Sequence, residues 1–152
     1  MYSREEVRQL REEFWTAFGQ YMRAVPSADG DRVSWLNYKT GIKHLYFRMD
    51  ADKTSARISI DMVDPDDGIR SLMYAQFVEL KNIFYDSVGE NWAWEEQTYR
   101  DDRTMATISA ELPNVSVFRK ADWPALISFF KPRIIALDEF WSLAKDHFEL
   151  FR

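Results

Sequence analysis

Residues 35–61 read WLNYKTGIKHLYFRMDADKTSARISID, and this stretch decides the fold. Apolar and polar residues alternate from residue 43 to 50, which is typical of a strand with one buried face. After a turn at residues 51–54 the alternation resumes, so the stretch predicts a β-hairpin. The residues expected on the inner face are Leu45, Phe47, Met49, Ala56, Ile58, Ile60 and Met62. Those expected on the outer face are His44, Tyr46, Arg48, Asp50, Arg57, Ser59 and Asp61.

A second hairpin is predicted at residues 92–99 and 104–112, joined by a polar turn. Its tryptophans, Trp92 and Trp94, are expected to point inward opposite small or branched residues, namely Ala106, Ile108 and Ala110. Residues 35–39 predict a short edge strand, and Gly41 predicts a bulge or tight bend after it. Four or five mainly antiparallel strands follow from these patterns.

Helices are predicted before, between and after the hairpins. Ser3 and Glu6 have the spacing of a capping box, and an apolar stripe follows to about Pro26. That stripe comprises Val7, Leu10, Phe14, Phe18, Tyr21 and Val25. A second helix is expected at residues 69–88, and Asp122 with Pro124 predicts the start of a third helical region.

The second helix carries two stripes. The inward stripe comprises Leu72, Met73, Gln76, Phe77, Leu80, Ile83 and Phe84. The weaker stripe comprises Tyr74, Val78, Lys81 and Tyr85, and it is left open whether this stripe meets solvent, another helix or a partner. Aspartates at 64, 66 and 67 predict a turn that caps the helix, because carboxylates stabilise its positive end.

Pro132 lies inside the last helical region and is expected to kink or split it, into a piece ending at Phe130 and a longer piece at residues 133–148. The seam on the longer piece is predicted to pack along the first helix; it comprises Ile134, Leu137, Trp141, Ala144 and Phe148. The sequence therefore predicts a single α+β domain over residues 1–152, of order αββαββα, with the helices packed on one face of the sheet.

Composition limits the function classes. A chain of 152 residues buries about 70% of its unfolded surface, and the 16% aromatic content supplies a bulky core or a contact surface. The net charge of −5 disfavours indiscriminate binding to phosphate backbones. With no cysteine, the sequence contains neither a thiolate nucleophile nor a cysteine metal ligand. The highly charged N-terminus and the lack of a long apolar run predict a cytoplasmic protein with no membrane partner.

Four segments resemble a bacterial family, domain of unknown function 4268: REEFWTAFGQYM, WLNYKTG, LKNIFYDSVGENWAWEE and DWPALISFFKPRI. The matching positions are Phe14 and Trp15, then Gly41, Gly89, Trp94 and Glu95, and finally Asp122, Trp123 and Pro124. This chain is similar to stand-alone members of the family. Other members follow restriction-endonuclease-like domains, which implies a link to DNA processing or phage defence in those proteins.

No motif predicts a catalytic site, a metal or a cofactor. His44 and His147 lack the spacing of a helical zinc pair, and the aspartates at 64–67 lack the later ligands of a calcium loop. The Glu79 and Lys81 pair falls in a helix, not on a nuclease strand. Glu95 and Glu96 are adjacent on a strand and point to opposite faces.

The outward face of the sheet is the candidate binding site: His44, Tyr46, Arg48, Arg57, Ser59 and Asp61, with Glu95 and Gln97 beside them. We expect a non-enzymatic interaction or accessory module that binds a protein partner or forms a homodimer. The alternative is a nucleic-acid-associated module, because arginines beside an aromatic ring can stack a base or hold a phosphate.

Overall fold

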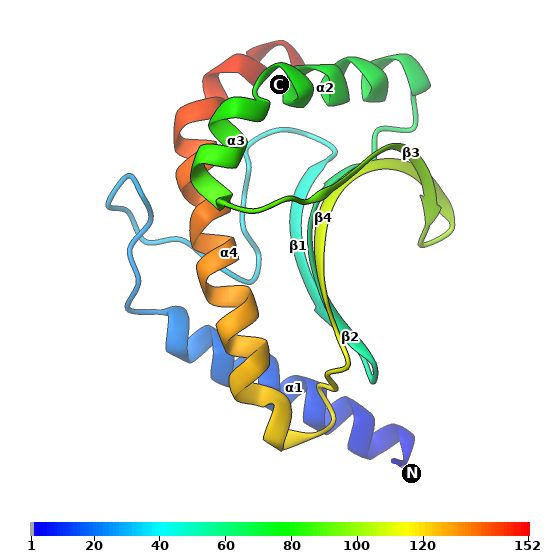
Figure 1. Ribbon diagram of the computed structural model, residues 1–152, viewed down its shortest axis with the longest axis vertical. Helices are drawn as coiled ribbons and strands as arrows, with labels where there is room; N and C mark the ends of the chain where they lie inside the picture. Colours follow the sequence, from blue (N-terminus) through cyan, green and yellow to red (C-terminus); the bar gives the residue numbers. More distant parts are fainter. Residues whose placement is uncertain (1) are drawn as a thin grey trace.

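The computed structural model describes residues 2–152, which form four α-helices and a four-stranded sheet (Figure 1). The chain order, interrupted by two 3₁₀ helices, is α1 (Arg4–Met22), β1 (Leu45–Ala51), β2 (Ser55–Met62), α2 (Asp67–Glu79), α3 (Lys81–Val88), β3 (Ala93–Arg100), β4 (Arg103–Pro113), η1 (Lys120–Asp122), α4 (Trp123–Ala144) and η2 (Lys145–Phe151). The α+β class is confirmed, and the order matches the prediction except that the middle helix is two helices.

The sheet is antiparallel, with strand order β1-β2-β4-β3. It curves strongly, and the helices lie on its convex side while the concave side stays open (Figure 1). A register shift between Glu95 and Thr98 adds one residue to β3, a bulge that sharpens the local twist. The tip of the β3–β4 hairpin therefore bends over the concave side.

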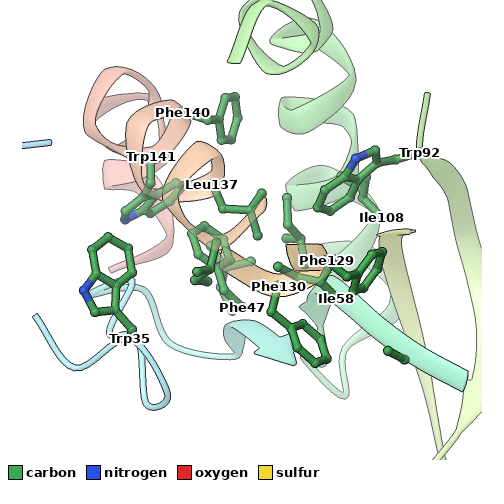
Figure 2. Packing of buried hydrophobic residues seen from close by; sticks show 14 of the residues in the cluster. Trp35, Phe47, Ile58, Trp92, Ile108, Phe129, Phe130, Leu137, Phe140 and Trp141 are labelled. Atoms are coloured by element: carbon green, nitrogen blue, oxygen red, sulfur yellow. The ribbon is translucent and has the colours of Figure 1, made fainter. Parts of the chain in front are cut away.

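Both hairpins have the predicted faces. Phe47 pairs with Ile60 and Ile60 with Ile108, so three strands contribute apolar side chains to one layer. These side chains are buried in one core cluster with Leu137 and Trp141 of α4 (Figure 2). The core therefore lies between the convex face of the sheet and α4.

The middle helix breaks at Leu80, a residue with φ −98° and ψ 15°. The prediction of one helix over residues 69–88 is therefore wrong. Neither glycine nor proline marks the break in the sequence. Leu80 is buried, and Phe84 beyond it packs edge-on against Phe140 of α4, with ring centroids 5.4 Å apart. Tertiary packing therefore breaks the helix, because the turn that redirects the chain places α3 along α4.

The second stripe of the middle helix is covered by Trp94 of β3. The indole Nε1 of Trp94 donates a hydrogen bond to the Tyr85 hydroxyl at 2.8 Å, and Lys81 lies 4.7 Å from the indole centroid. Tyr74 packs against the same ring at 6.1 Å, so only Val78 of the stripe is exposed. This stripe therefore meets a strand of its own chain, and neither solvent, another helix nor a partner covers most of it.

Helix α4 continues through Pro132 without a split, so the predicted division is wrong. Proline has no amide to donate to the Ser128 carbonyl four residues earlier, so α4 lacks one helical hydrogen bond. Next to Pro132, the Arg133 side chain donates from Nη1 to the Phe129 carbonyl at 2.9 Å, and its guanidinium also donates to Glu90 at 2.8 and 2.7 Å. Neither α4 nor another helix within residues 2–152 is long and apolar enough to cross a membrane.

The predicted seam runs from α4 into η2 and packs differently from the prediction. Trp141 lies 5.7 Å from Phe47 of β1, and Phe148 lies 4.6 Å from Phe77 of α2. The seam therefore meets the sheet and α2. Helix α1 instead contacts the first half of α4, where Phe14 packs against Phe130. The predicted capping box of α1 is present, but Tyr21 of its predicted stripe is half exposed.

Residues 23–44 form an irregular connection, so the predicted edge strand at residues 35–39 is wrong. Hydrogen bonds from two side chains fix the position of this connection. The indole of Trp35 donates to the Val25 carbonyl at 3.0 Å, and the Tyr38 hydroxyl donates to Asp138 of α4 at 2.5 Å. Asp138 also accepts from the Ala28 amide at 2.6 Å. Trp35 and Tyr38 both point inward although they are three residues apart, which does not fit the alternation of a strand. Gly41, with φ +79°, makes the predicted bend.

Asp138 is the buried acceptor that holds this connection. Asp138→Ala is expected to lower the free energy of unfolding by roughly 1–3 kcal/mol, because two part-buried donors lose their acceptor. Glu139→Ala, at the exposed neighbouring position on α4, should change it by less than about 0.5 kcal/mol. Urea unfolding followed by circular dichroism measures both values. Equal effects would contradict this role for Asp138.

Candidate functional site

The concave face of the sheet carries polar side chains in register across the strands. Tyr46 on β1 lies opposite Asp61 on β2, which lies opposite Thr107 on β4. The neighbouring rows are Arg48, Ser59 and Ser109, and then Asp50, Arg57 and Glu111. Glu95 of β3 extends the first row. Strand alternation therefore brings together Tyr46, Arg48, Arg57, Ser59, Asp61 and Glu95. Gln97 falls in the bulge of β3 between Glu95 and Thr98, where the register is interrupted, and His44 lies outside this face.

Asp61 is enclosed at the floor of this face, with 3% of its surface exposed. Its Oδ1 accepts a hydrogen bond from the Thr107 hydroxyl at 3.0 Å, and the same hydroxyl oxygen accepts from Arg57 Nη2 at 3.0 Å. The guanidinium nitrogens of Arg48 and Arg57 come within 3.7 and 3.9 Å of the carboxylate. These distances balance charge but exceed hydrogen-bond length, so both arginines retain donors for another acceptor.

Arg57 is the most constrained cation of the face, since its side chain is only 13% exposed. Burial lowers the pKa of Arg57, and the positive charge of Arg100 lowers it further. The carboxylates of Asp61, Glu111 and Glu95 act in the opposite direction. The guanidinium stays charged because an arginine remains protonated even after such a shift. Two like charges held close together favour the approach of an anion.

Tyr46 and Arg48 form the exposed part of the face. The Arg48 guanidinium lies 4.6 Å from the centroid of the Tyr46 ring, a cation–π arrangement that holds both side chains. Tyr46 is 43% exposed. The pair therefore presents a flat aromatic surface beside a cation with free donors.

A cavity of about 610 Å³ lies over this face, within the size range of ligand sites. Its wall includes the connection before β1 and the tip of the β3–β4 hairpin. The lining residues are Leu36, Asn37, Tyr38, Lys39, Tyr46, Phe47, Arg48, Met49, Asp50, Arg57, Ser59, Asp61, Arg100 and Asp101. Lys39 and Arg100 were missed from the sequence, because only the loop path and the hairpin curl bring them here.

Tyr38 stiffens the wall of the cavity. Its ring stacks on Phe47 at a centroid distance of 5.2 Å, and burial raises the pKa of the phenol well above its ordinary value. The hydrogen bond to Asp138 raises it further, so Tyr38 stays protonated and continues to donate. The position of the wall is thereby fixed by α4.

His44 lies away from the concave face. It precedes β1 with φ +65°, and its carbonyl accepts from the Val63 amide at 2.9 Å. It borders a hollow of about 340 Å³ whose exposed apolar members are Ile69, Leu72 and Leu150. Leu72 was expected to face inward, but it is exposed at this hollow.

The aspartates before α2 have the predicted structural role. Asp66 is the N-cap of α2 and accepts from the Ile69 amide at 2.9 Å, while Asp64 accepts from the Asp66 amide at 2.8 Å. Asp67 pairs with the buried side chain of Arg70. All three carboxylates therefore serve the turn and the helix start.

Thr107 links Asp61 to Arg57, so its hydroxyl is expected to stabilise the floor of the site. Thr107→Val should lower the free energy of unfolding by roughly 1–3 kcal/mol, because a buried carboxylate loses its donor. Thr104→Val on the same strand should change it by less than about 0.5 kcal/mol. Chemical denaturation compares the two variants, and similar values for both would contradict the link.

A family model matches residues 10–145, nearly the whole chain, and its description reads Domain of unknown function (DUF4268). The match includes every strand, α2, α3, α4 and most of α1. No curated protein matches the chain significantly. No solved structure does so either.

Proposed function

The chain belongs to the family Domain of unknown function (DUF4268), and we propose that it is a non-enzymatic interaction module that binds a partner protein through its concave face. The observation that carries this proposal is the cavity of about 610 Å³ lined by cations and carboxylates. Lys39, Arg48, Arg57 and Arg100 lie there with Asp50, Asp61 and Asp101. Mixed charge of this kind selects a partner by complementarity.

The position of Asp61 favours binding over catalysis. A general acid or base must come within hydrogen-bond reach of the proton that it transfers. The Asp61 carboxylate is buried below Arg48 and Arg57 and already accepts from Thr107. The side chains that a binding partner would contact first are Tyr46 and Arg48, which are the exposed ones. Aromatic and arginine side chains often contribute most of the binding energy of a protein interface.

The partner in this proposal is another protein or a second copy of the chain, in the cytoplasm. An absence of cysteine and an acidic, highly charged sequence fit that compartment. Charge of both signs on the face suits a protein surface, which offers carboxylates and ammonium groups together. A uniform polyanion would meet repulsion from Asp50, Asp101 and Glu111.

The proposal is tested by capturing partners from extracts of the native cells and quantifying them by mass spectrometry. The double variant Tyr46→Ala with Arg48→Glu should reduce recovery of the specific partner at least about tenfold, because interface anchors each contribute 2 kcal/mol or more. Light scattering of the purified protein reports whether a second copy is the partner.

Two control variants locate the contact. Arg4→Glu reverses a charge in the first turn of α1, where a glutamate is tolerated, and should leave recovery unchanged. Leu72→Ser alters the apolar hollow near His44 and should also leave it unchanged. Loss of the partner with Leu72→Ser alone would move the interface to α2. A monomer that captures no protein would overturn the proposal.

A nucleic-acid-associated module linked to DNA processing or phage defence is the second candidate. The arrangement of Tyr46 beneath Arg48 favours it, because an exposed ring and a guanidinium can stack a base and hold a phosphate. Arg57 and Arg100 add positive charge behind this pair. Single-stranded nucleic acid suits such a surface better than a duplex.

This candidate predicts salt-dependent binding to single-stranded DNA, measured by fluorescence anisotropy against a duplex of the same sequence. Affinity should fall as salt rises, because phosphate contacts release counterions. The double variant Arg48→Ala with Arg57→Ala should abolish binding, while Arg4→Ala should retain it. Absence of measurable binding at low salt would end this candidate.

A further inference from the structure

Strand β1 is an edge of the sheet, and its hydrogen-bond pattern shows which backbone groups face outward. The Val63 amide donates to the His44 carbonyl, and the Asp52 amide donates to the Ser55 carbonyl, both at 2.9 Å. Antiparallel strands exchange such bonds at every second residue. The even-numbered residues of β1 therefore bond to β2, and the backbone groups of Phe47 and Met49 point away from the sheet.

The two ends of this outer edge are already satisfied. Leu45 donates to the Ile42 carbonyl at 3.4 Å and accepts from the Thr40 hydroxyl at 3.0 Å. The Ala51 amide donates to the side chain of Asp50 at 2.9 Å. Between these ends, the outward amides and carbonyls of Phe47 and Met49 bond to no group of residues 2–152. Both residues line the cavity of about 610 Å³.

The opposite edge of the sheet is arranged differently. Strand β3 contains the bulge between Glu95 and Thr98 and carries adjacent glutamates at 95 and 96. Bulges and charges of this kind protect an edge from pairing with another strand. Only β1 combines unbulged pairing with its neighbour and a cavity at its outer edge.

Charge defines what an added strand must carry. In a ladder built on Phe47 and Met49, the even residues of β1 form non-hydrogen-bonded pairs, whose Cα atoms lie only about 4.5 Å apart. The side chain opposite Arg48 would then face the same cavity as Arg57 and Arg100. An acidic side chain suits that position, and a basic one suits the position opposite Asp50.

We infer that β1 is the docking edge for an extended segment of a partner protein, which adds a fifth strand with an acidic residue opposite Arg48. This inference rests on the proposed interaction function and gives it a binding mode. Nucleic acid offers no peptide groups to match the free amides and carbonyls of Phe47 and Met49. A second copy pairing through its own β1 would bring two arginine clusters together.

The test uses capped peptides designed for this edge. In antiparallel order TKVEVYT places lysine opposite Asp50, glutamate opposite Arg48 and tyrosine opposite Tyr46, and TYVEVKT does the same for a parallel strand. One of the two should bind measurably by titration calorimetry. Exchanging its lysine and glutamate should weaken binding at least about tenfold, because both charge pairs become repulsive.

Backbone methylation separates strand addition from simple charge attraction. In the antiparallel complex the two valines of TKVEVYT exchange hydrogen bonds with Met49 and Phe47, whereas the glutamate amide points away. N-methylation of either valine should weaken binding at least about tenfold, and N-methylation of the glutamate should have little effect. In the parallel complex, too, only every second peptide amide donates to β1, so N-methylation should weaken binding at alternate positions of the peptide. Equal effects at all positions, or no binding by either peptide at millimolar concentration, would overturn the inference.

A protein variant separates this inference from the proposed function. Met49→Pro removes an outward amide and keeps the bonds between β1 and β2, which proline on an edge strand permits. With its fold verified by circular dichroism, this variant should lose both the peptide and the captured partner. A partner that is lost with Arg48→Glu but kept with Met49→Pro would reject strand addition and leave the interaction function standing. A dimer that Met49→Pro converts to monomer would identify a second copy as the occupant and overturn the inference.

Discussion

Burial of α4 is the constraint on which the rest of the structure depends. Its residues contact the convex face of the sheet, α1, α3 and the long connection before β1, so a single helix joins all layers. Leu137, Phe140 and Trp141 are nearly inaccessible to solvent, and an interior of this kind is packed as densely as an organic crystal. Helices α4 and α2 both pack against the convex face of the sheet, and no helix within residues 2–152 covers the concave face. The open concave surface is thus a direct result of one-sided packing.

Polar residues on that surface are more buried than their outward orientation suggests. Asp61 and Ser59 point away from the core, yet the side chains of Arg48 and Arg57 lie over them. A carboxylate in such a place needs compensating charge, and the arginines supply it at distances that leave donors free. The guanidinium groups that stabilise the floor therefore also offer donors to a bound acceptor. Structural and binding roles overlap in these two arginines.

Strand alternation made much of this surface predictable from sequence. The register of β1 and β2 follows from Leu45, Phe47 and Ile58, and it places Tyr46, Arg48 and Asp61 on one face. Alternation does not predict the path of the connection before β1 or the curl of the β3–β4 hairpin. The presence of Lys39 and Arg100 in the cavity could therefore not be predicted from the sequence. The break at Leu80 and the bulge after Glu95 were missed because no glycine or proline marks either one. At Leu80 the break follows from the packing of α3 along α4. His44 was misplaced because a left-handed backbone angle at a histidine has no local signal.

The tryptophans have a consequence beyond their bulk. Trp35, Trp92, Trp94, Trp123 and Trp141 each donate an indole hydrogen bond, to Val25, Glu90, Tyr85, Val117 and Thr40 respectively. Buried indoles usually find such acceptors. Here the acceptors lie in the connection before β1, in α3 and the turn after it, and in the segment before η1. The chain consequently carries a distributed set of natural fluorophores. Single replacements of these rings by phenylalanine would resolve which layer loosens first when the protein is heated.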